Sequence, residues 1–223
     1  MMPTDTGTSY CAGTSYAGSN KAVAGINSVL ADLVATGSTG GGFATSTAGK
    51  GKYVVYGLAQ CRGDVSAADC AACLTADAKQ LPISCSSSSD ARIWYDYCFM
   101  LYDNSNFIGQ SDTDAGVVYV NVQVADNAKA FAKLVEYTPF VSVYGLAQCT
   151  RDLAPLTCAQ CLSTAVSRFG EYCGAQVGCQ INYSSCRVRH EIYPFYFPVD
   201  GDPGGRAATD LTKYTKIVVR VHP

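Results

Sequence analysis

The spacing of the cysteines constrains this chain more than any other feature. The hexapeptide Tyr56–Cys61 recurs letter for letter at Tyr144–Cys149, an offset of 88 residues. Four more pairs of cysteines keep the same offset: Cys70 and Cys158, Cys73 and Cys161, Cys85 and Cys173, Cys98 and Cys186. Self-similarity at a fixed period is the signature of a duplicated structural unit. The sequence therefore predicts two tandem domains.

The length of 223 residues suits two domains of about 100 residues each, and each can bury a modest core. We expect the first domain over residues 1–110 and the second over residues 115–200. Residues 201–223 begin with Gly201, Pro203 and Gly204, a composition typical of linkers. We therefore expect a linker or tail over residues 201–223.

The predicted elements alternate between helices and strands. Ala22–Val34 has the apolar spacing of an amphipathic helix, and 128–135 is its weaker copy in the second repeat. A second helix begins after Ser66, which has an acidic partner three residues on, and its copy begins at Pro155. Strand-like segments lie at residues 53–60, 92–102, 117–122, 140–148 and 180–193. The fold class that follows is α+β, with two helices on one face of an antiparallel sheet in each domain.

Twelve cysteines are an even number and a high count for a cytosolic protein. The two C-x2-C motifs could also indicate zinc or redox chemistry. Zinc requires four ligands, and a redox thiol requires a lowered pKa, yet no basic residue flanks Cys70 or Cys158. We therefore predict structural disulfides, three in each domain, with no metal and no cofactor.

The duplication helps to choose the disulfide pairing, because equivalent cysteines should pair equivalently. Cys11 and Cys179 lack counterparts, and Cys173 is near enough in sequence to bond Cys179. The equivalent bond in the first repeat is then Cys11–Cys85. A short link between a strand and a helix, Cys61–Cys70, leaves Cys73 for Cys98. The copies in the second repeat are Cys149–Cys158 and Cys161–Cys186.

Composition excludes several classes of function. The formal net charge of −2 offers no basis for nucleic-acid binding driven by charge. The sequence has no run of 18 apolar residues, so we predict no membrane span. Residues 1–5 lack the basic and apolar regions of a signal peptide. Together with the cysteines, this favours a secreted protein whose signal peptide has been removed.

Two segments carry a resemblance to a known family. Val55–Asp64, with its C-x8-C-x2-C spacing, and Val143–Leu153 resemble the plant ginkbilobin-like domain, also called the stress-antifungal domain. Tyr183–Tyr196 is similar to the end of the second such domain in tandem proteins, and the resemblance spans residues 8–197. The usual disulfide pattern of this family agrees with the pairing above. The resemblance implies a secreted protein of the plant apoplast.

The resemblance also implies a carbohydrate site. The single-domain antifungal member binds mannose through an Asn after the first cysteine, an Arg that opens the penultimate strand and a Glu that closes the last. The Arg and Glu positions hold Arg92 and Asp103 in the first repeat, and Gln180 and Glu191 in the second. The Asn position holds Ala12 in the first repeat, a departure from the family, and Asn121 is the candidate in the second.

Distance along the chain limits how the first site can form. Arg92 and Asp103 are eleven residues apart, about 36 Å along a straight strand. They can share a sugar only if the chain reverses near Tyr97, which would make them a cross-strand pair about 5 Å apart. An ordinary surface salt bridge between the two is the alternative. Aromatic residues beside this turn, Trp94, Tyr95, Tyr97 and Tyr102, are more typical of a core than of a sugar platform.

Three functions compete on this basis. The first is a secreted antifungal defence protein that binds mannose-type glycans, with the fungal cell wall as its target. The second is an extracellular protein-interaction module, a receptor-like ectodomain or the target of a microbial protein. An enzyme is not predicted, because Asp103 and Glu191 lie in different domains and a glycosidase needs paired carboxyls. Asn182 begins a glycosylation sequon.

Overall fold

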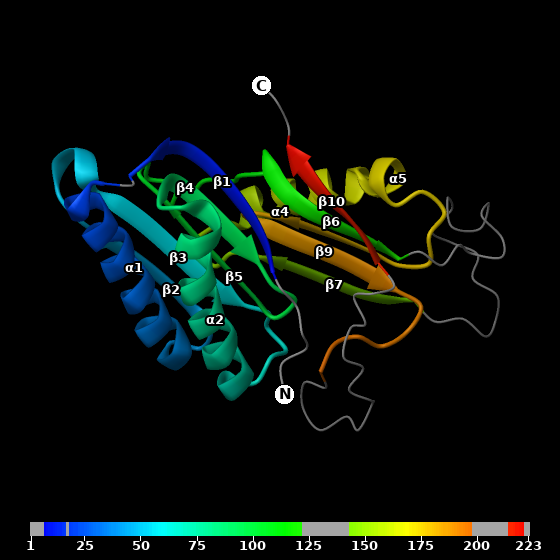
Figure 1. The fold of residues 1–223 in the computed structure, drawn as a ribbon. Coiled ribbons are helices and arrows are strands. Elements are labelled where there is room, and N and C mark those ends of the chain that lie inside the picture. Colours follow the sequence, from blue (N-terminus) through cyan, green and yellow to red (C-terminus); the bar gives the residue numbers. More distant parts are fainter. Residues whose placement is uncertain (1–6, 17, 122–142, 198–213, 221–223) are drawn as a thin grey trace. The chain divides into compact units, whose positions relative to one another are not determined.

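The chain divides into two compact units, Met1–Gln110 and Ser111–Pro223, each built on one antiparallel sheet (Figure 1). The computed structural model describes residues 7–16, 18–121, 143–197 and 214–220. Within those ranges, no helix combines the length and the apolar character that a membrane crossing requires. The α+β class and the division into two domains are confirmed.

The sheet of the first unit has five strands in the order β1-β4-β5-β3-β2. Every neighbouring pair in it is antiparallel. The strands are β1 (Thr8–Ser15), β2 (Phe43–Ala48), β3 (Val55–Cys61), β4 (Ser88–Trp94) and β5 (Cys98–Asp103). A short 3₁₀ helix, Gly51–Tyr53, joins β2 to β3.

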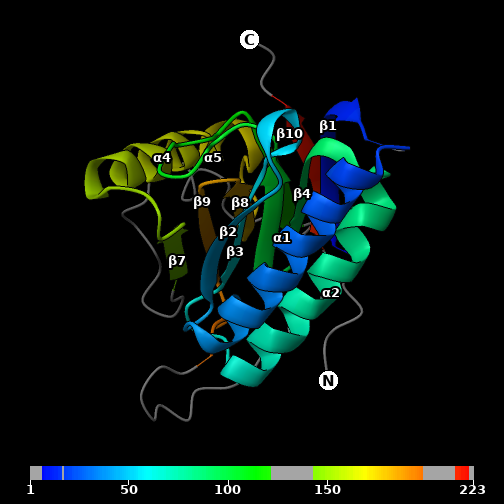
Figure 2. The same cartoon turned by 90° about the vertical axis from the view of Figure 1, so that its left-hand side faces the viewer.

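Helices α1 (Asn20–Thr39) and α2 (Ala67–Cys85) cover one face of this sheet (Figure 2). The apolar positions of α1 recur every three or four residues, and Ile26, Leu30 and Leu33 are buried in the core beneath it. Ser66 caps α2 as expected, because its hydroxyl accepts from the Asp69 amide at 3.1 Å. Gly57 on β3 lets α1 approach: a methyl group there would lie 2.9 Å from Leu33 Cδ1 and would also clash with Val29.

The described part of the second unit repeats four strands and the second helix of this plan, and it adds one strand and one short helix, while no described strand corresponds to β2. Its sheet has the order β10-β6-β8-β9-β7 and is antiparallel throughout. Its elements are β6 (Ala115–Asn121), β7 (Tyr144–Cys149), α4 (Pro155–Ser167), α5 (Phe169–Tyr172), β8 (Cys179–Tyr183), β9 (Cys186–Glu191) and β10 (Tyr214–Arg220). The predicted helix 128–135 and the start of the predicted strand 140–148 lie outside the described residues. Pro155 opens α4, as predicted.

The extra strand differs from the expectation for the C-terminal segment. A linker or tail is expected over residues 201–223, yet Tyr214–Arg220 forms β10 and pairs antiparallel with β6 over all seven residues. Its sequence explains this, because Tyr, Thr, Ile and Val dominate the segment and these residues favour strands. The glycine-rich part of the predicted linker lies outside the described residues.

All twelve cysteines form disulfides, and every predicted pair is confirmed. Cys61–Cys70 and Cys149–Cys158 both have Cα atoms 5.7 Å apart, and each ties a strand end to the following helix. Cys73–Cys98 and Cys161–Cys186 fasten that helix to the next strand hairpin. Each unit has a third disulfide, Cys11–Cys85 in the first and Cys173–Cys179 in the second. Cys85 and Cys173 are equivalent, but their partners come from different places in the two repeats. The C-x2-C sulfur atoms are therefore all bonded outside their own motif.

Candidate functional site

The chain reverses between β4 and β5, as the site hypothesis requires, but the register differs from the expected one. Arg92 faces Leu101 across the hairpin, and Asp103 faces Asp90. Arg92 and Asp103 are thus diagonal neighbours on one face of the sheet, at a typical spacing of about 7–8 Å. The prediction that they form a direct cross-strand pair was wrong, because the register of the hairpin is shifted from the one it assumed.

Arg92 instead pairs with Asp90, two residues earlier on the same strand. Its Nε lies 3.1 Å from Asp90 Oδ1 and its Nη2 lies 3.0 Å from Asp90 Oδ2, which is a bidentate contact. Successive side chains of a strand point to opposite faces, so residues two apart share a face. The two side chains are 10% and 15% exposed. This ion pair is therefore shielded but still within reach of solvent.

Asp103 stands beside that ion pair on β5. Burial raises the pKa of the Asp103 carboxyl, and the negative charge of Asp90 adds to the rise while Arg92 opposes it. The Ser105 amide donates to Asp103 Oδ1 at 2.8 Å and holds the carboxyl in place. The first repeat thus presents one guanidinium between two carboxyl groups, which together offer donors and acceptors for hydroxyl groups.

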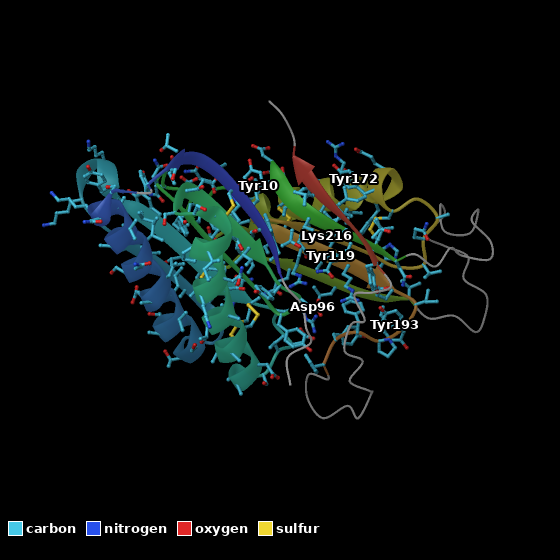
Figure 3. All side chains as sticks on the ribbon, viewed as in Figure 1. Tyr10, Asp96, Tyr119, Tyr172, Tyr193 and Lys216 are labelled. Carbon is cyan, nitrogen blue, oxygen red and sulfur yellow. A yellow bond between two sulfur atoms is a disulfide. The ribbon has the colours of Figure 1, made fainter. Side chains whose placement is uncertain are left out.

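Two tyrosines flank this cluster on the same face. Tyr10 on β1 pairs with Arg92, whose guanidinium carbon lies 5.5 Å from its ring centre, and Tyr56 on β3 pairs with Asp103. Tyr10 appears in Figure 3 on the blue strand β1. Both are partly exposed. The aromatic residues beside the hairpin turn behave differently, since Trp94 and Tyr102 are buried and belong to the packing of the unit.

The second repeat places a related set of residues at the same points of its sheet. Asn121 ends β6, and its backbone N–H donates to the Gly178 carbonyl at 2.9 Å. Gly178 is the counterpart of Asp90 by the repeat offset, and Ala12 faces Asp90 in the first unit. Asn121 therefore occupies the sheet position of Ala12. Tyr119 and Tyr144 likewise repeat Tyr10 and Tyr56.

The ion pair of the second repeat lies on a different strand. Gln180, in the Arg92 position, donates to Asn182 Oδ1 at 2.8 Å and faces Arg189. Arg189 Nε lies 3.1 Å from Glu191 Oε1, and the two side chains are 1% and 0% exposed. Although Gln180 is neutral, Glu191 does not lack a charged partner, because Arg189, in the position of Leu101, supplies it.

A glycine makes room for the Glu191 carboxylate. A methyl group at Gly178 would lie 2.5 Å from Glu191 Cδ, so the carboxylate fills the space that a side chain would take there. Asp90 takes that space in the first unit. The exchange of Asp90 for Gly178 and of Leu101 for Arg189 moves the charge pair from β4 in the first unit to β9 in the second.

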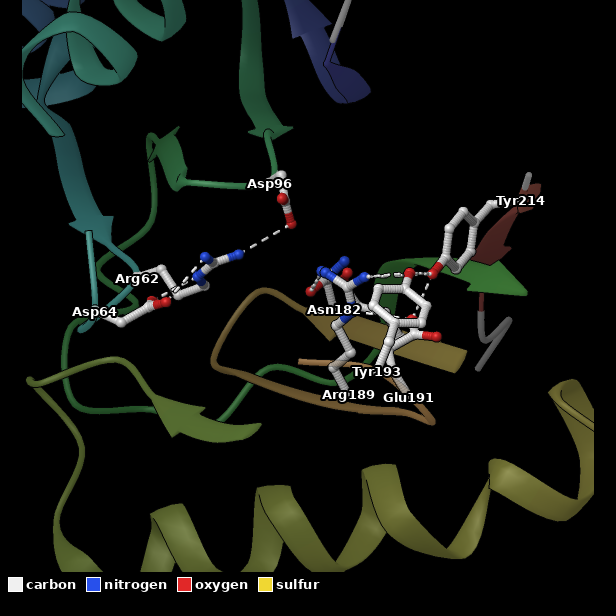
Figure 4. A network of polar contacts seen from close by, with 9 residues as sticks. Arg62, Asp64, Asp96, Asn182, Arg189, Glu191, Tyr193 and Tyr214 are labelled. Carbon is white, nitrogen blue, oxygen red and sulfur yellow. Dashed lines mark hydrogen bonds and ion pairs between the residues drawn. The ribbon is translucent and has the colours of Figure 1, made fainter. Parts of the chain in front are cut away.

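Tyr214 of β10 completes the second cluster (Figure 4). Its hydroxyl donates to Glu191 Oε1 at 2.6 Å and accepts from Arg189 Nη2 at 3.3 Å. The same hydroxyl also contacts that of Tyr193. Burial raises the pKa of Glu191, while Arg189 and Tyr214 oppose the rise. A ligand hydroxyl has no open approach to Glu191 in this arrangement, since the carboxylate is fully buried.

Figure 4 also shows a polar group of the first unit that serves the fold. Arg62 follows β3, and its guanidinium makes a bidentate contact with Asp64 at 2.6 and 2.9 Å. The same guanidinium reaches Asp96 at 3.3 Å and lies over the ring of Tyr97. These contacts join the end of β3 to the turn between β4 and β5. The group therefore holds the hairpin that carries Arg92 in place.

Arg92 and Asp103 lie on one face of the first sheet, and Gln180 and Glu191 lie at the equivalent positions of the second. Sequence reasoning named these four residues. It missed Asp90, Arg189 and Tyr214, which decide how those residues are paired. The signal for the first two was present, because each lies two residues from a predicted site residue on a strand. Nothing in the sequence pattern near Tyr214 indicated that it would reach Glu191.

The family model for salt stress response/antifungal domains matches residues 10–105 and 112–193, once in each unit. Cysteine-rich repeat secretory protein 55 of Arabidopsis thaliana is 45% identical, over 78% of this chain and 77% of that protein. The antimicrobial ginkbilobin-2-like protein of Castanea crenata is 34% identical, over 81% of this chain and 84% of that protein.

Solved structures of tandem DUF26 ectodomains have a similar fold. The tandem DUF26 ectodomain of the Arabidopsis thaliana cysteine-rich receptor-like protein PDLP8 superposes with a TM-score of 0.73 at 25% identity, over 82% of this chain and 96% of that one. The ectodomain of PDLP5 gives a TM-score of 0.69 at 27% identity, over 83% and 98%. The family model matches most of the chain, and two relatives exceed 30% identity over more than two thirds of their length, so the chain belongs to the salt stress response/antifungal (DUF26) domain family, with two copies of the domain in tandem.

Proposed function

We propose that this protein is a secreted, non-catalytic defence protein of the plant apoplast whose first repeat binds mannose-type glycans, with the fungal cell wall as target. The observation that carries the proposal is the partly exposed cluster of Asp90, Arg92 and Asp103 between Tyr10 and Tyr56. The antimicrobial and secretory names of its relatives support the biological setting.

The chemistry of the cluster suits a sugar. Arg92 has a planar guanidinium that Asp90 holds in place through Nε and Nη2, and this cation and the carboxyl of Asp103 offer a donor and an acceptor for sugar hydroxyl groups. Tyrosine rings at either side offer apolar faces to the C–H groups of a pyranose. Asp90 holds the Arg92 guanidinium in a bidentate contact, and Asp103 lies diagonally across the hairpin from it, so acceptors and a cation lie on one face of the sheet.

In this proposal the first repeat is the open site and the second is not. Asn121, Gln180 and Glu191 keep more of the family's polar set than the first repeat does, but Glu191 is fully buried in its contacts with Arg189 and Tyr214. Ala12 weakens the first site by one hydrogen bond, because it stands where the second repeat has Asn121.

Isothermal titration with methyl α-mannoside tests the proposal, and galactoside is the sugar control. Hydrogen bonds to charged groups are worth about 1.5–3 kcal/mol each, so Arg92→Ala should weaken binding about tenfold or more. Ala12→Asn should strengthen binding about fivefold, since it restores one neutral hydrogen bond of about 1 kcal/mol. The matched control is Arg168→Ala, which removes an exposed arginine that pairs only at the surface.

A protein-interaction module is the second candidate function. Ala12 in place of the family's asparagine favours it, and so do the solved relatives, which are ectodomains of cysteine-rich receptor-like proteins. If neither the native protein nor Ala12→Asn gives heat with mannoside, the carbohydrate proposal fails. Capture of a receptor ectodomain or microbial protein that Arg92→Ala abolishes would then support the module.

A further inference from the structure

Strand β10 has no counterpart in the described part of the first unit. Its backbone pairs with β6 over seven residues, with Tyr214 opposite Asn121 and Lys216 opposite Tyr119. In the first unit β1, the counterpart of β6, is an edge strand of its sheet. The second unit therefore has an added strand whose first residue lies at the polar cluster.

The described side chains of β10 are mostly exposed, and Tyr214 is half-buried. Of the described side chains Tyr214–Val218, all but Tyr214 are exposed, and Ile217 and Val218 are 39% and 43% exposed. A strand with few buried apolar contacts belongs to the least stable part of a fold and opens at a modest free-energy cost. Among the described side chains of β10, attachment is thus concentrated at Tyr214.

Tyr214 places a hydroxyl between a carboxylate and a guanidinium. Its donation to Glu191 and its acceptance from Arg189 are both charge-assisted, the strongest class of hydrogen bond in proteins. The guanidinium carbon of Arg189 lies 5.8 Å from the Tyr214 ring centre. A hydroxyl of a bound sugar would make the same two contacts, so Tyr214 takes the place that a polyol ligand would need.

We infer that β10 is a closing strand and that the Tyr214 hydroxyl occupies the ligand site of the second repeat, so that this site binds a hydroxyl-bearing ligand only when β10 leaves β6. The inference rests on the proposed function for the class of ligand. The closed protein then has one active sugar site and the opened protein has two, and two linked sites would raise avidity for a multivalent glycan.

Hydrogen exchange tests the closing contact without any ligand. In the full chain, Tyr214→Phe removes only the hydroxyl, and amide exchange over β10 should rise about tenfold or more. Thr215→Ala is the matched control, because Thr215 is exposed on the same strand and points to the other face. Equal exchange in Tyr214→Phe, Thr215→Ala and the native chain would overturn the inference.

Mannoside titration tests the site itself with four full-length proteins. We expect one site in the native chain and two in Tyr214→Ala. We expect one site weakened about tenfold or more in Arg92→Ala, and that weakened site together with one gained site in the double variant Arg92→Ala/Tyr214→Ala. Binding by the double variant supports the inference even if the native chain proves inactive, which would sink only the proposed function of the first repeat. A native chain that binds, with no site gained in either Tyr214→Ala protein, overturns the inference and leaves the proposed function standing. Faster exchange with no gained site overturns it too, since Tyr214 is then a structural contact alone.

Discussion

The fit of Glu191 against Gly178 predicts a large effect for a small change. In Gly178→Ala the new methyl group would lie 2.5 Å from Glu191 Cδ, well inside the usual carbon–carbon contact distance of about 3.5–4.0 Å. Glu191 is fully buried, so its carboxylate cannot turn out to solvent without moving its neighbours. The substitution therefore pushes the carboxylate away from Arg189 and Tyr214.

The expected loss of stability follows from the contacts that are disturbed. Removal of one partner from a buried ion pair costs about 3–5 kcal/mol. The added methyl group displaces the carboxylate without deleting it, so we expect about half of that, about 2 kcal/mol. For a unit of this size, the midpoint of thermal unfolding should fall by about 8–16 °C.

Thermal and urea unfolding with the disulfides intact are the assays. Gly170→Ala is the matched control, because no atom lies within 4 Å of a methyl group there. The first unit has a side chain at the equivalent position, Asp90, and the residue that faces it is the shorter Asp103. A shorter carboxyl at position 191 should relieve the clash in Gly178→Ala. Glu191→Asp should therefore recover about 1 kcal/mol in the Gly178→Ala background while it destabilises the native chain. A Gly178→Ala protein as stable as Gly170→Ala, or a strictly additive double variant, would refute this reasoning.

Two further predictions concern pH and glycosylation. The folded pKa of Asp103 is raised by burial above its ordinary value of 3.8, so the folded state binds more protons, and its contribution to stability is complete below pH 3.8 and is lost as pH rises through the folded pKa. Asp103→Asn should flatten the fall in unfolding free energy over that window, and an unchanged slope in urea unfolding from about pH 3 to about pH 7 would contradict it. The sequon at Asn182 should carry no glycan after secretion from a eukaryotic host, because Asn182 is buried in β8 and accepts from Gln180. Intact mass spectrometry checks this, and the addition of a glycan mass to the 23.5 kDa chain would show the prediction to be wrong.

The features that repeat in the sequence were predictable, because the two copies constrain each other. Cys173 and Cys179 are only six residues apart in the sequence, so a bond between them can be proposed from their spacing. Because equivalent cysteines should pair equivalently, that bond then implies Cys11–Cys85. The cap at Ser66 and the start of α4 at Pro155 are local effects with local signals.

Pairing within the site was not predictable, since it depends on register and on side chains from three strands. The register of the β4–β5 hairpin sets Leu101 opposite Arg92, where Asp103 was the expected neighbour. The role of Gly178 depends on the length of a side chain opposite it. Tyr214 reaches Glu191 only because β10 adds to β6 in one register, and that pairing joins segments almost a hundred residues apart.

The positions of the disulfides give the two units different responses to a protease. The bond Cys11–Cys85 closes a ring that contains α1, β2, β3, α2 and most of β1, so a single cut inside that ring leaves both pieces covalently joined. In the second unit the last cysteine is Cys186, and no covalent ring encloses β10. One cut between Cys186 and Tyr214 would leave β10 attached by non-covalent contacts alone. The cleaved fragment would then dissociate when the protein is diluted. Proteolysis could thus remove Tyr214 from the second repeat while the first repeat stays whole.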